Sequence, residues 1–348
     1  MRLKTQMNHK HTSFPNKLGL STRLHLVVFA AIALWPGSVV SALSQTADSF
    51  DPNAASGSYG ILAMAVQPDN KIVICGAFTN VGGVARTNFA RLDVDGNLEV
   101  PFDPEPNAAP QVLAVQTDGK ILVGGDFTAL GGVTHNHIGR LNYDGSLDTN
   151  FTAGTDGPVY GLLVQGDGKI LVWGEFTQLA GQPRTRIGRL KNDGSLDTSF
   201  DPGSGADDSI FTVALQQDGK FIVGGYNFGF AGHACHGIAR LNGDGSFDDS
   251  FQPIIAFTDY KVIYGLVLQP DGKVLASSAE RPTGFSNFDI YTRRFKTDGS
   301  LDATTKNGVG FFNSTTSVRE SGARTATDSA GGRTVSLFAS PYASPPRM

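Results

Sequence analysis

The sequence predicts an all-β protein built as a β-propeller, and three observations support this expectation. Glycine supplies 43 of the 348 residues and only 17% are charged, a balance that excludes coiled coils and long helix bundles. The hydrophobic share of 40% is too high for a disordered chain. The same short phrases also recur about every 50 residues, which is the signature of a repeat architecture.

The first 44 residues have the order of a secretory signal peptide. Five Lys or Arg and no acid lie in this segment, where an apolar run from Leu26 to Trp35 is followed by small residues. Ala42 and Ser44 fit the −3 and −1 positions of a cleavage site that leaves Gln45 first. A signal anchor is the rival interpretation, but the apolar run is shorter than the roughly 20 residues that span a bilayer. We therefore expect a secreted, periplasmic or cell-surface protein.

Removing this segment makes the chain more acidic. Of the 28 Lys and Arg, 23 lie beyond residue 44, where they face all 32 Asp and Glu, so the formal net charge changes from −4 to −9. An acidic exported protein is a poor partner for nucleic acid or anionic lipid. We expect neither, and no membrane span after cleavage.

Two sequence markers define the repeat. The first is Asp-Gly-Lys, at 118–120, 167–169, 218–220 and 271–273, with the variant Asp-Asn-Lys at 69–71. The second is Arg-Leu followed by Asp-Gly, at 91–96, 140–145, 189–194 and 240–245, and more loosely at 294–299. Because both markers recur at spacings of 49 to 54 residues, the chain contains five units.

Each unit is predicted to form four short strands. In the second unit these are 112–116, 120–125, 138–141 and a fourth segment from Ser146 toward Phe151. Asp-Gly between apolar runs predicts hairpins with type I′ turns, in which both central residues have positive φ. One such meander cannot cover both of its apolar faces, so neighbouring units must do so. Radial stacking of four-stranded units gives a β-propeller.

The repeated phrases resemble one known family. Ser-Leu-Asp-Thr-Ser-Phe-Asp-Pro at 195–202, followed by Ala-Leu-Gln at 214–216 and Asp-Gly-Lys at 218–220, is similar to the delta-60 repeat. So is Leu-Val-Gly-Gly-Asp-Phe-Thr at 122–128, which leads to Gly-Arg-Leu at 139–141. The resemblance covers about residues 47–302. It implies a tandem β-propeller of bacterial, mostly exported proteins, and it implies no established activity.

The expected organisation is a signal peptide at 1–44, five blades at 45–302 and a degenerate or truncated sixth blade at 303–348. The candidate hairpin of the sixth blade spans 324–338, with its turn at 328–332. Ser-Phe-Asp-Pro at 49–52 repeats 199–202, so the start of the mature chain is a candidate for the strand that closes the ring. An imperfectly closed or six-bladed ring and an open arc of five blades are both compatible with this pattern.

The rim opposite the Asp-Gly turns is the predicted binding surface, because it varies between units while the Asp-Gly rim does not. Just before the third strand, four successive units carry cationic or titratable side chains. Arginine at such a position suits an anion or a sugar acid, whereas the alternative is that these groups pair with nearby acids or face water. The candidate residues are Arg86, His135, His137, Arg184, Arg186, His233 and His236.

No cofactor or metal site is predicted. The histidine clusters lie two units apart, whereas structural zinc needs four ligands in paired local spacings. Cys75 and Cys235 lie in non-adjacent units and are expected to be separate thiols. Trp173 occupies a slot that holds Cys75, Gly124 or Gly224 in other units, and we interpret it as blade packing rather than a sugar platform.

Catalysis is not expected either. Asp126 and Glu175 occupy the same slot in adjacent units, and as paired carboxylates they are the candidates for the alternative function, a hydrolase or lyase acting on polysaccharide. Neither a nucleophile elbow nor a cofactor loop accompanies them. The sequence therefore favours an exported, non-catalytic binding or structural module for a carbohydrate or a surface protein.

Overall fold

The computed structural model describes residues 60–226, 228–253, 260–281 and 289–302, and three further strands at 308–310, 323–327 and 334–338. Every regular element in these residues is a β-strand, and none of them is a helix able to cross a bilayer. The predicted signal segment, the phrase at 49–52 and the turn at 328–332 lie outside the described residues.

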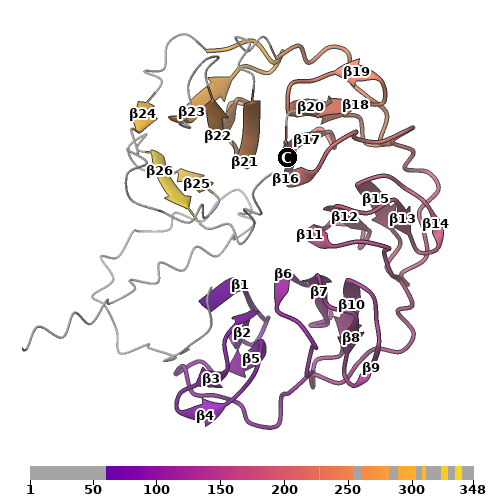
Figure 1. The fold of residues 1–348 in the computed structure, drawn as a ribbon, viewed down its shortest axis with the longest axis vertical. Coiled ribbons are helices and arrows are strands. Elements are labelled where there is room, and N and C mark those ends of the chain that lie inside the picture. The colour runs from indigo at the N-terminus through magenta and orange to yellow at the C-terminus, as the bar shows by residue number, and fades with distance from the viewer. Residues whose placement is uncertain are drawn as a thin grey trace, which may run out of the picture. The chain divides into compact units, whose positions relative to one another are not determined.

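Five sheets follow one another along the chain, and they are the blades of a β-propeller (Figure 1). In each blade the first strand pairs with the second and the second with the third, always antiparallel. The three strands are β1 (Gly60–Val66), β2 (Ile72–Ala77) and β5 (Phe89–Leu92) in blade 1; β6 (Pro110–Val115), β7 (Ile121–Gly125) and β10 (Ile138–Leu141) in blade 2; β11 (Val159–Val164), β12 (Ile170–Gly174) and β15 (Ile187–Leu190) in blade 3; β16 (Ile210–Leu215), β17 (Phe221–Gly225) and β20 (Ile238–Leu241) in blade 4; and β21 (Tyr260–Leu268), β22 (Val274–Arg281) and β23 (Asp289–Phe295) in blade 5.

The fourth segment of each predicted meander is shorter than a full strand. It pairs with the third strand through one bridge, as between Leu147 and Leu141. The strand ends there because the chain turns at Asp148, whose carbonyl accepts the N–H of Phe151 at 3.1 Å. In blade 5, β24 (Gly308–Gly310) also pairs with β23.

A small two-stranded ribbon, which the sequence did not predict, lies between the second and third strands of blades 1 to 4. The ribbons are β3 (Asn80–Val81) with β4 (Val84–Ala85), β8 (Ala129–Leu130) with β9 (Val133–Thr134), β13 (Gln178–Leu179) with β14 (Gln182–Pro183), and β18 (Gly229–Phe230) with β19 (His233–Ala234). Their Gly-containing tips are the loops that the sequence placed on the variable rim.

The Asp-Gly turns are three-residue hairpin loops, so the prediction of type I′ turns is wrong. In blade 2 the N–H of Gln116 donates to the carbonyl of Lys120 at 2.8 Å, and the N–H of Gly119 donates to the carbonyl of Gln116 at 2.9 Å. Only Gly119 has a positive φ, of 82°. The carboxylate of Asp118 instead accepts the Lys120 N–H at 3.1 Å, which supports a turn whose last residue alone is left-handed.

The core lies between neighbouring blades. Side chains alternate along each strand, so Ile121 and Val123 of β7 pack with Phe89 of blade 1, while Leu122 packs with Val172 of blade 3. Every residue of β7 is consequently buried. This confirms the expectation that neighbouring units cover the two apolar faces of each meander.

The first strands β1, β6, β11, β16 and β21 lie next to one another in chain order, toward the centre of Figure 1. Beyond them β21 contacts β25 (Ala323–Thr327), which pairs with β26 (Thr334–Phe338). This hairpin matches the one expected at 324–338. Closure of the ring by the segment at 49–52 stays a prediction.

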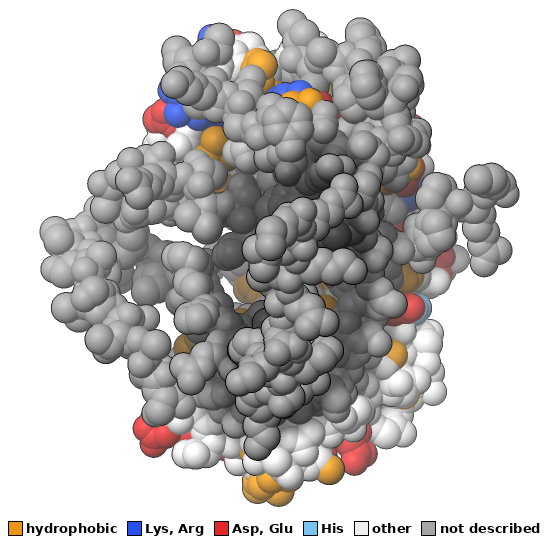
Figure 2. All heavy atoms as spheres, turned by 60° about the vertical axis from the view of Figure 1, so that its left-hand side comes forward, with side chains coloured by type: hydrophobic (Ala, Val, Ile, Leu, Met, Phe, Trp, Pro, Cys, Tyr) orange, Lys and Arg blue, Asp and Glu red, His pale blue; other side chains and the backbone are white. Residues whose placement is uncertain are grey.

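Large apolar side chains that reach the surface are scattered. Figure 2 shows apolar and acidic groups as small separate spots on the described part of one face. Exposed apolar residues scattered singly are normal on a protein surface. Among the described residues the most exposed are Val66, Val84, Val94, Val100, Val133 and Tyr143.

Candidate binding rim

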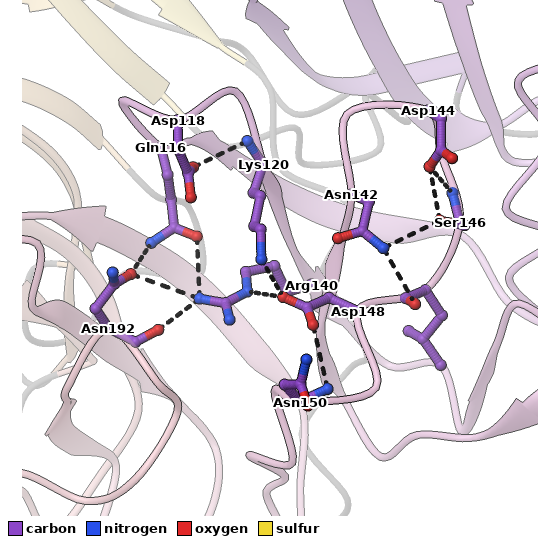
Figure 3. Close-up of polar contacts among 11 residues, drawn as sticks. Gln116, Asp118, Lys120, Arg140, Asn142, Asp144, Ser146, Asp148, Asn150 and Asn192 are labelled. Atoms are coloured by element: carbon purple, nitrogen blue, oxygen red, sulfur yellow. Dashed lines mark hydrogen bonds and ion pairs between the residues drawn. The ribbon is translucent and has the colours of Figure 1, made fainter.

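The Asp-Gly rim holds polar clusters that join neighbouring blades, and Figure 3 shows the one between blades 2 and 3. In blade 2, Arg140 and Lys120 donate to the same carboxylate oxygen of Asp148, at 2.8 and 2.7 Å. Arg140 also donates through Nη1 to the backbone carbonyl of Asn192 in blade 3, at 2.5 Å. The amide of Gln116 donates to the Asn192 side chain at 2.8 Å. We call the Gln, Lys, Arg and acid of each blade the blade clasp.

The blade clasp explains why both sequence markers recur. The Lys of Asp-Gly-Lys and the Arg of Arg-Leu pair with one acid in all five blades. In blades 1 to 4 the Arg also donates to a backbone carbonyl of the following blade. These donors and acceptors are Arg91 and Tyr143, Arg140 and Asn192, Arg189 and Gly243 (2.9 Å), and Arg240 and Thr297 (2.6 Å).

In blades 1 to 4 the pKa of the clasp acid lies below its usual value. Burial alone would raise the pKa of Asp148, but hydrogen bonds from Lys120 and from the N–H of Asn150, with the charge of Arg140, hold the pKa below its usual value. Burial would also raise the pKa of Asp197 and Asp248, but hydrogen bonds from neighbouring Ser, Lys and Arg residues lower it. The charges of these clasps are therefore paired within the protein.

The three candidate arginines on the opposite rim bind the chain that leads toward the next blade. Each donates a guanidinium N–H to a backbone carbonyl of that connection, and Arg86, which is 4% exposed, also pairs with Asp103. These bonds support a structural role for the arginines, and an anion site at them stays a prediction. The acceptors are Val100 for Arg86 (2.5 Å), Phe200 for Arg184 (3.5 Å) and Ala206 for Arg186 (2.9 Å).

The two candidate histidines of blade 2 interact within their own blade. Nδ1 of His135 lies 3.0 Å from the carbonyl of Ile138, and a carbonyl only accepts, so this nitrogen is the donor. Nδ1 of His137 lies 3.6 Å from the carboxylate of Asp126. The backbone of His137 is left-handed, with φ of 64°, and its N–H donates to the carbonyl of Phe127 at 2.8 Å.

The remaining two candidates, His233 and His236, line one hollow of about 340 Å³ in blade 4. The ring of His233 stacks on Phe247 with centroids 4.1 Å apart, and its Nδ1 lies 3.5 Å from Asp249. Cys235 also lines the hollow, and burial raises the pKa of its thiol to about 11. The thiol is therefore protonated at neutral pH, and in the described part of the chain no group of His, Cys, Asp and Glu is placed to hold a metal ion.

Asp126 and Glu175, the candidate pair for the alternative catalytic function, both follow a second strand and are exposed. Asp126 faces His137, as described above, and Glu175 accepts a hydrogen bond from the hydroxyl of Tyr160 at 2.7 Å. Each carboxylate thus interacts within its own blade.

The structure also shows a row of aromatic side chains that sequence reasoning missed. Each first strand has a β-bulge at the same place, and the bulged residues of blades 3, 4 and 5 are aromatic. The ring of Phe211 lies 5.8 Å from that of Tyr160 and 6.1 Å from that of Tyr264. We call these three side chains the aromatic row. Their spacings of 51 and 53 residues match those of Asp-Gly-Lys, so the signal was present in the sequence.

Trp173 packs against Gly161, the residue that follows Tyr160 of this row. It is 7% exposed and belongs to the core between blades 3 and 4. Its ring lies over Gly161, where a Cβ would stand 1.9 Å from the indole. At the corresponding pair of blade 2 the large and small residues are exchanged: the first strand carries Val112 and the second strand carries Gly124. The packing role expected for Trp173 agrees with this geometry.

Blade 5 buries a lysine side chain of its own. Lys261, which is 3% exposed, has its Nζ 3.7 Å from Oε1 of Glu280. The same oxygen pairs with Arg293 and accepts a hydrogen bond from Ser278 at 2.9 Å. Burial and the nearby Arg293 charge lower the pKa of Lys261 to about 6. Burial therefore disfavours the charged form of Lys261.

Both cysteines are unpaired and buried, as expected from their positions in non-adjacent blades. Burial also raises the pKa of the Cys75 thiol. Neither thiol has the thiolate character that nucleophilic or metal-binding cysteines need.

Comparison with solved structures shows a limited likeness. One match is the extracellular domain of BT4673 from B. thetaiotaomicron, described as a one component system, at 12% identity and a TM-score of 0.40. The match covers 73% of this chain and 33% of that one, so this chain spans about a third of that protein's length. A search of curated proteins found no match.

Comparison with protein families gives a direct result. The pattern of a family described as "Domain of unknown function (DUF5122) beta-propeller" matches residues 67–102, 116–151, 165–200, 216–251 and 269–304. These five segments cover 180 of the 348 residues, and each contains the four clasp residues of one blade. The chain therefore belongs to the DUF5122 β-propeller family, in agreement with its resemblance to the delta-60 repeat.

Proposed function

We propose that this chain is an exported, non-catalytic β-propeller that binds carbohydrate through the rim opposite the Asp-Gly turns. The observation that carries the proposal is the difference between the two rims. The clasp residues of the Asp-Gly rim repeat from blade to blade and bind one another, whereas the opposite rim presents different polar groups in each blade. Variable groups on a rigid frame are the usual basis of recognition.

Carbohydrate is favoured over other polymers by charge and chemistry. A net charge of −9 beyond residue 44 repels polyanions such as nucleic acid. Sugar hydroxyls both donate and accept hydrogen bonds, so exposed carboxylates such as Asp126 and Glu175 suit them. A protein of the cell surface is the second ligand class.

The same two carboxylates do not favour catalysis. Acid and base catalysis by a carboxylate pair needs two groups that face one substrate bond from distinct environments. Asp126 and Glu175 are both exposed, and each interacts with a neighbour of its own blade. This arrangement supports a binding role for them.

The test is a glycan array of neutral and acidic polysaccharides, combined with an assay for released reducing ends. We expect saturable binding and no release. Failure to bind any glycan overturns the proposal. Release that Asp126→Asn abolishes overturns the non-catalytic part and establishes the hydrolase alternative. Arg184→Ala is the control for an anion site, and we expect it to leave the binding of neutral glycans unchanged.

A further inference from the structure

We propose that the aromatic row is where the carbohydrate binds, with the apolar faces of successive sugar units stacked on Tyr160, Phe211 and Tyr264. This inference rests on the proposed function and names its site. The ligand class is an oligosaccharide of at least three units rather than a single sugar.

The row is set by the backbone. A β-bulge adds one residue to a strand and changes the direction of the side chain at that point. Because all five first strands carry the bulge at the same place, the bulged side chains of adjacent strands come close to one another. The ring contacts from Tyr160 to Phe211 and from Phe211 to Tyr264 confirm this for blades 3 to 5.

The fold does not require aromatic residues at the bulge. Blades 1 and 2 have Leu62 and Gln111 there, with the same bulge and the same pairing. The three rings also fall between the segments that match the family pattern, so they are not part of the repeated clasp. A half-buried aromatic at three successive bulges is therefore a property of this chain beyond what its architecture needs.

The surroundings of the row match the chemistry of a sugar. A sugar ring has apolar C–H faces and a rim of hydroxyl groups, so its site needs a flat apolar surface beside hydrogen-bonding groups. The row supplies three neighbouring apolar rings, whose planes differ by 33° between Tyr160 and Phe211 and by 19° between Phe211 and Tyr264. Glu175, held by the Tyr160 hydroxyl at 2.7 Å, supplies an exposed acceptor at one end. The two ring spacings, 5.8 and 6.1 Å, are nearly equal, as a ligand made of repeating units requires.

The chain also contains a reporter for the site. Trp173 packs over Gly161, the residue that follows Tyr160, and the other tryptophan, Trp35, lies in the predicted signal segment. Binding on the row should therefore change the fluorescence of Trp173.

The experiment measures the affinity of the purified protein for oligosaccharides of one to six units from a polysaccharide that the array identifies. We expect affinity to rise up to three units, and Phe211→Ala to weaken the binding of the trisaccharide about tenfold. Phe211→Tyr should retain binding. Phe211→Leu keeps apolar volume without the aromatic face and should also weaken it, which separates stacking from loss of packing. Leu62→Ala is the matched control at the same bulge of blade 1, and it should bind as wild type does.

The outcomes separate this inference from the proposed function. Glycan binding that Phe211→Ala and Phe211→Leu leave unchanged overturns the aromatic row as the site while the binding function stands. Absence of glycan binding in the wild type overturns both. Weakened binding in Phe211→Leu, with wild-type melting temperature and with Leu62→Ala unaffected, supports the row.

Discussion

The blade clasp makes a quantitative prediction that separates two cations bound to the same carboxylate. Arg189 is 7% exposed and donates to Asp197 at 2.7 Å and to the carbonyl of Gly243 in the next blade at 2.9 Å. Lys169 lies 3.1 Å from the same oxygen of Asp197, but its side chain is 32% exposed. Replacing each with Met keeps most of the apolar stem and removes the charge.

The two substitutions should differ severalfold in their cost. Breaking a buried ion pair costs about 3–5 kcal/mol. In Arg189→Met the carboxylate of Asp197 keeps only the more exposed Lys169 as its partner, and the Gly243 carbonyl loses its donor, so we expect a loss toward the lower end of that range. An exposed pair contributes about 0–1 kcal/mol, so Lys169→Met should be close to neutral. Asp197→Leu added to Arg189→Met removes the buried carboxylate, which Lys169 alone then neutralises, and should recover part of the loss.

The assay is urea unfolding followed by the fluorescence of Trp173. The free energies of unfolding are compared between variants whose free energy depends on urea concentration with the same slope. Equal losses in the two variants, or a loss below about 1 kcal/mol for Arg189→Met, would show that the clasp does not hold adjacent blades together. A double variant less stable than Arg189→Met would contradict the role assigned to the Asp197 charge.

Three further predictions concern buried groups. Lys261→Met should stabilise the protein at pH 7. The folded pKa of Lys261, about 6, lies below its ordinary value of 10.5, so between these pH values the unfolded chain binds more protons than the folded one, and wild-type stability falls with falling pH by up to about 1.4 kcal/mol per pH unit. The advantage of the variant, measured by denaturant unfolding, should therefore shrink toward pH 10. Gly161→Val should destabilise the wild type by about 1–3 kcal/mol, because the new side chain clashes with Trp173. In a Trp173→Gly background the same substitution should be neutral or stabilising, as thermal melts followed by circular dichroism can show. Destabilisation in both backgrounds would refute the packing argument. Cys75 and Cys235 should react slowly with a thiol reagent at pH 8 in the folded protein and rapidly in urea, whereas one fast thiol in the folded state would contradict their burial.

Periodicity predicted the second and third strands well, because they are covered on both faces and their burial leaves an uninterrupted apolar run. The run around Leu122 is an example, buried at every position of β7. The turns were predicted less well. Asp118-Gly119 has the composition of a type I′ turn, but the hydrogen bond from the Lys120 N–H to the Asp118 carboxylate supports a different geometry that composition does not reveal.

The candidate site was harder to predict, because its interactions depend on backbone atoms. Arg184 and Arg186 resembled ligand-binding residues on a variable rim, yet both donate to carbonyls of the connecting chain, and a carbonyl has no sequence signature. The aromatic row depends on a bulge, which shifts side chains out of simple alternation. Its spacing was visible in the sequence, but its meaning depended on knowing that Tyr160 and Phe211 lie on adjacent strands.

The form of the clasp explains how one architecture can accommodate changing binding residues. The acceptor for each interblade arginine is a carbonyl, and the residues that provide it are Tyr143, Asn192, Gly243 and Thr297, which share no side-chain chemistry. A blade therefore needs no particular partner residue in its neighbour, only a backbone in the right place. Since the clasp fixes adjacent blades at the Asp-Gly rim, the bulged residues of the first strands can change without loss of the interblade bond. That independence is what allows three blades to carry aromatic rings where the other two carry Leu62 and Gln111.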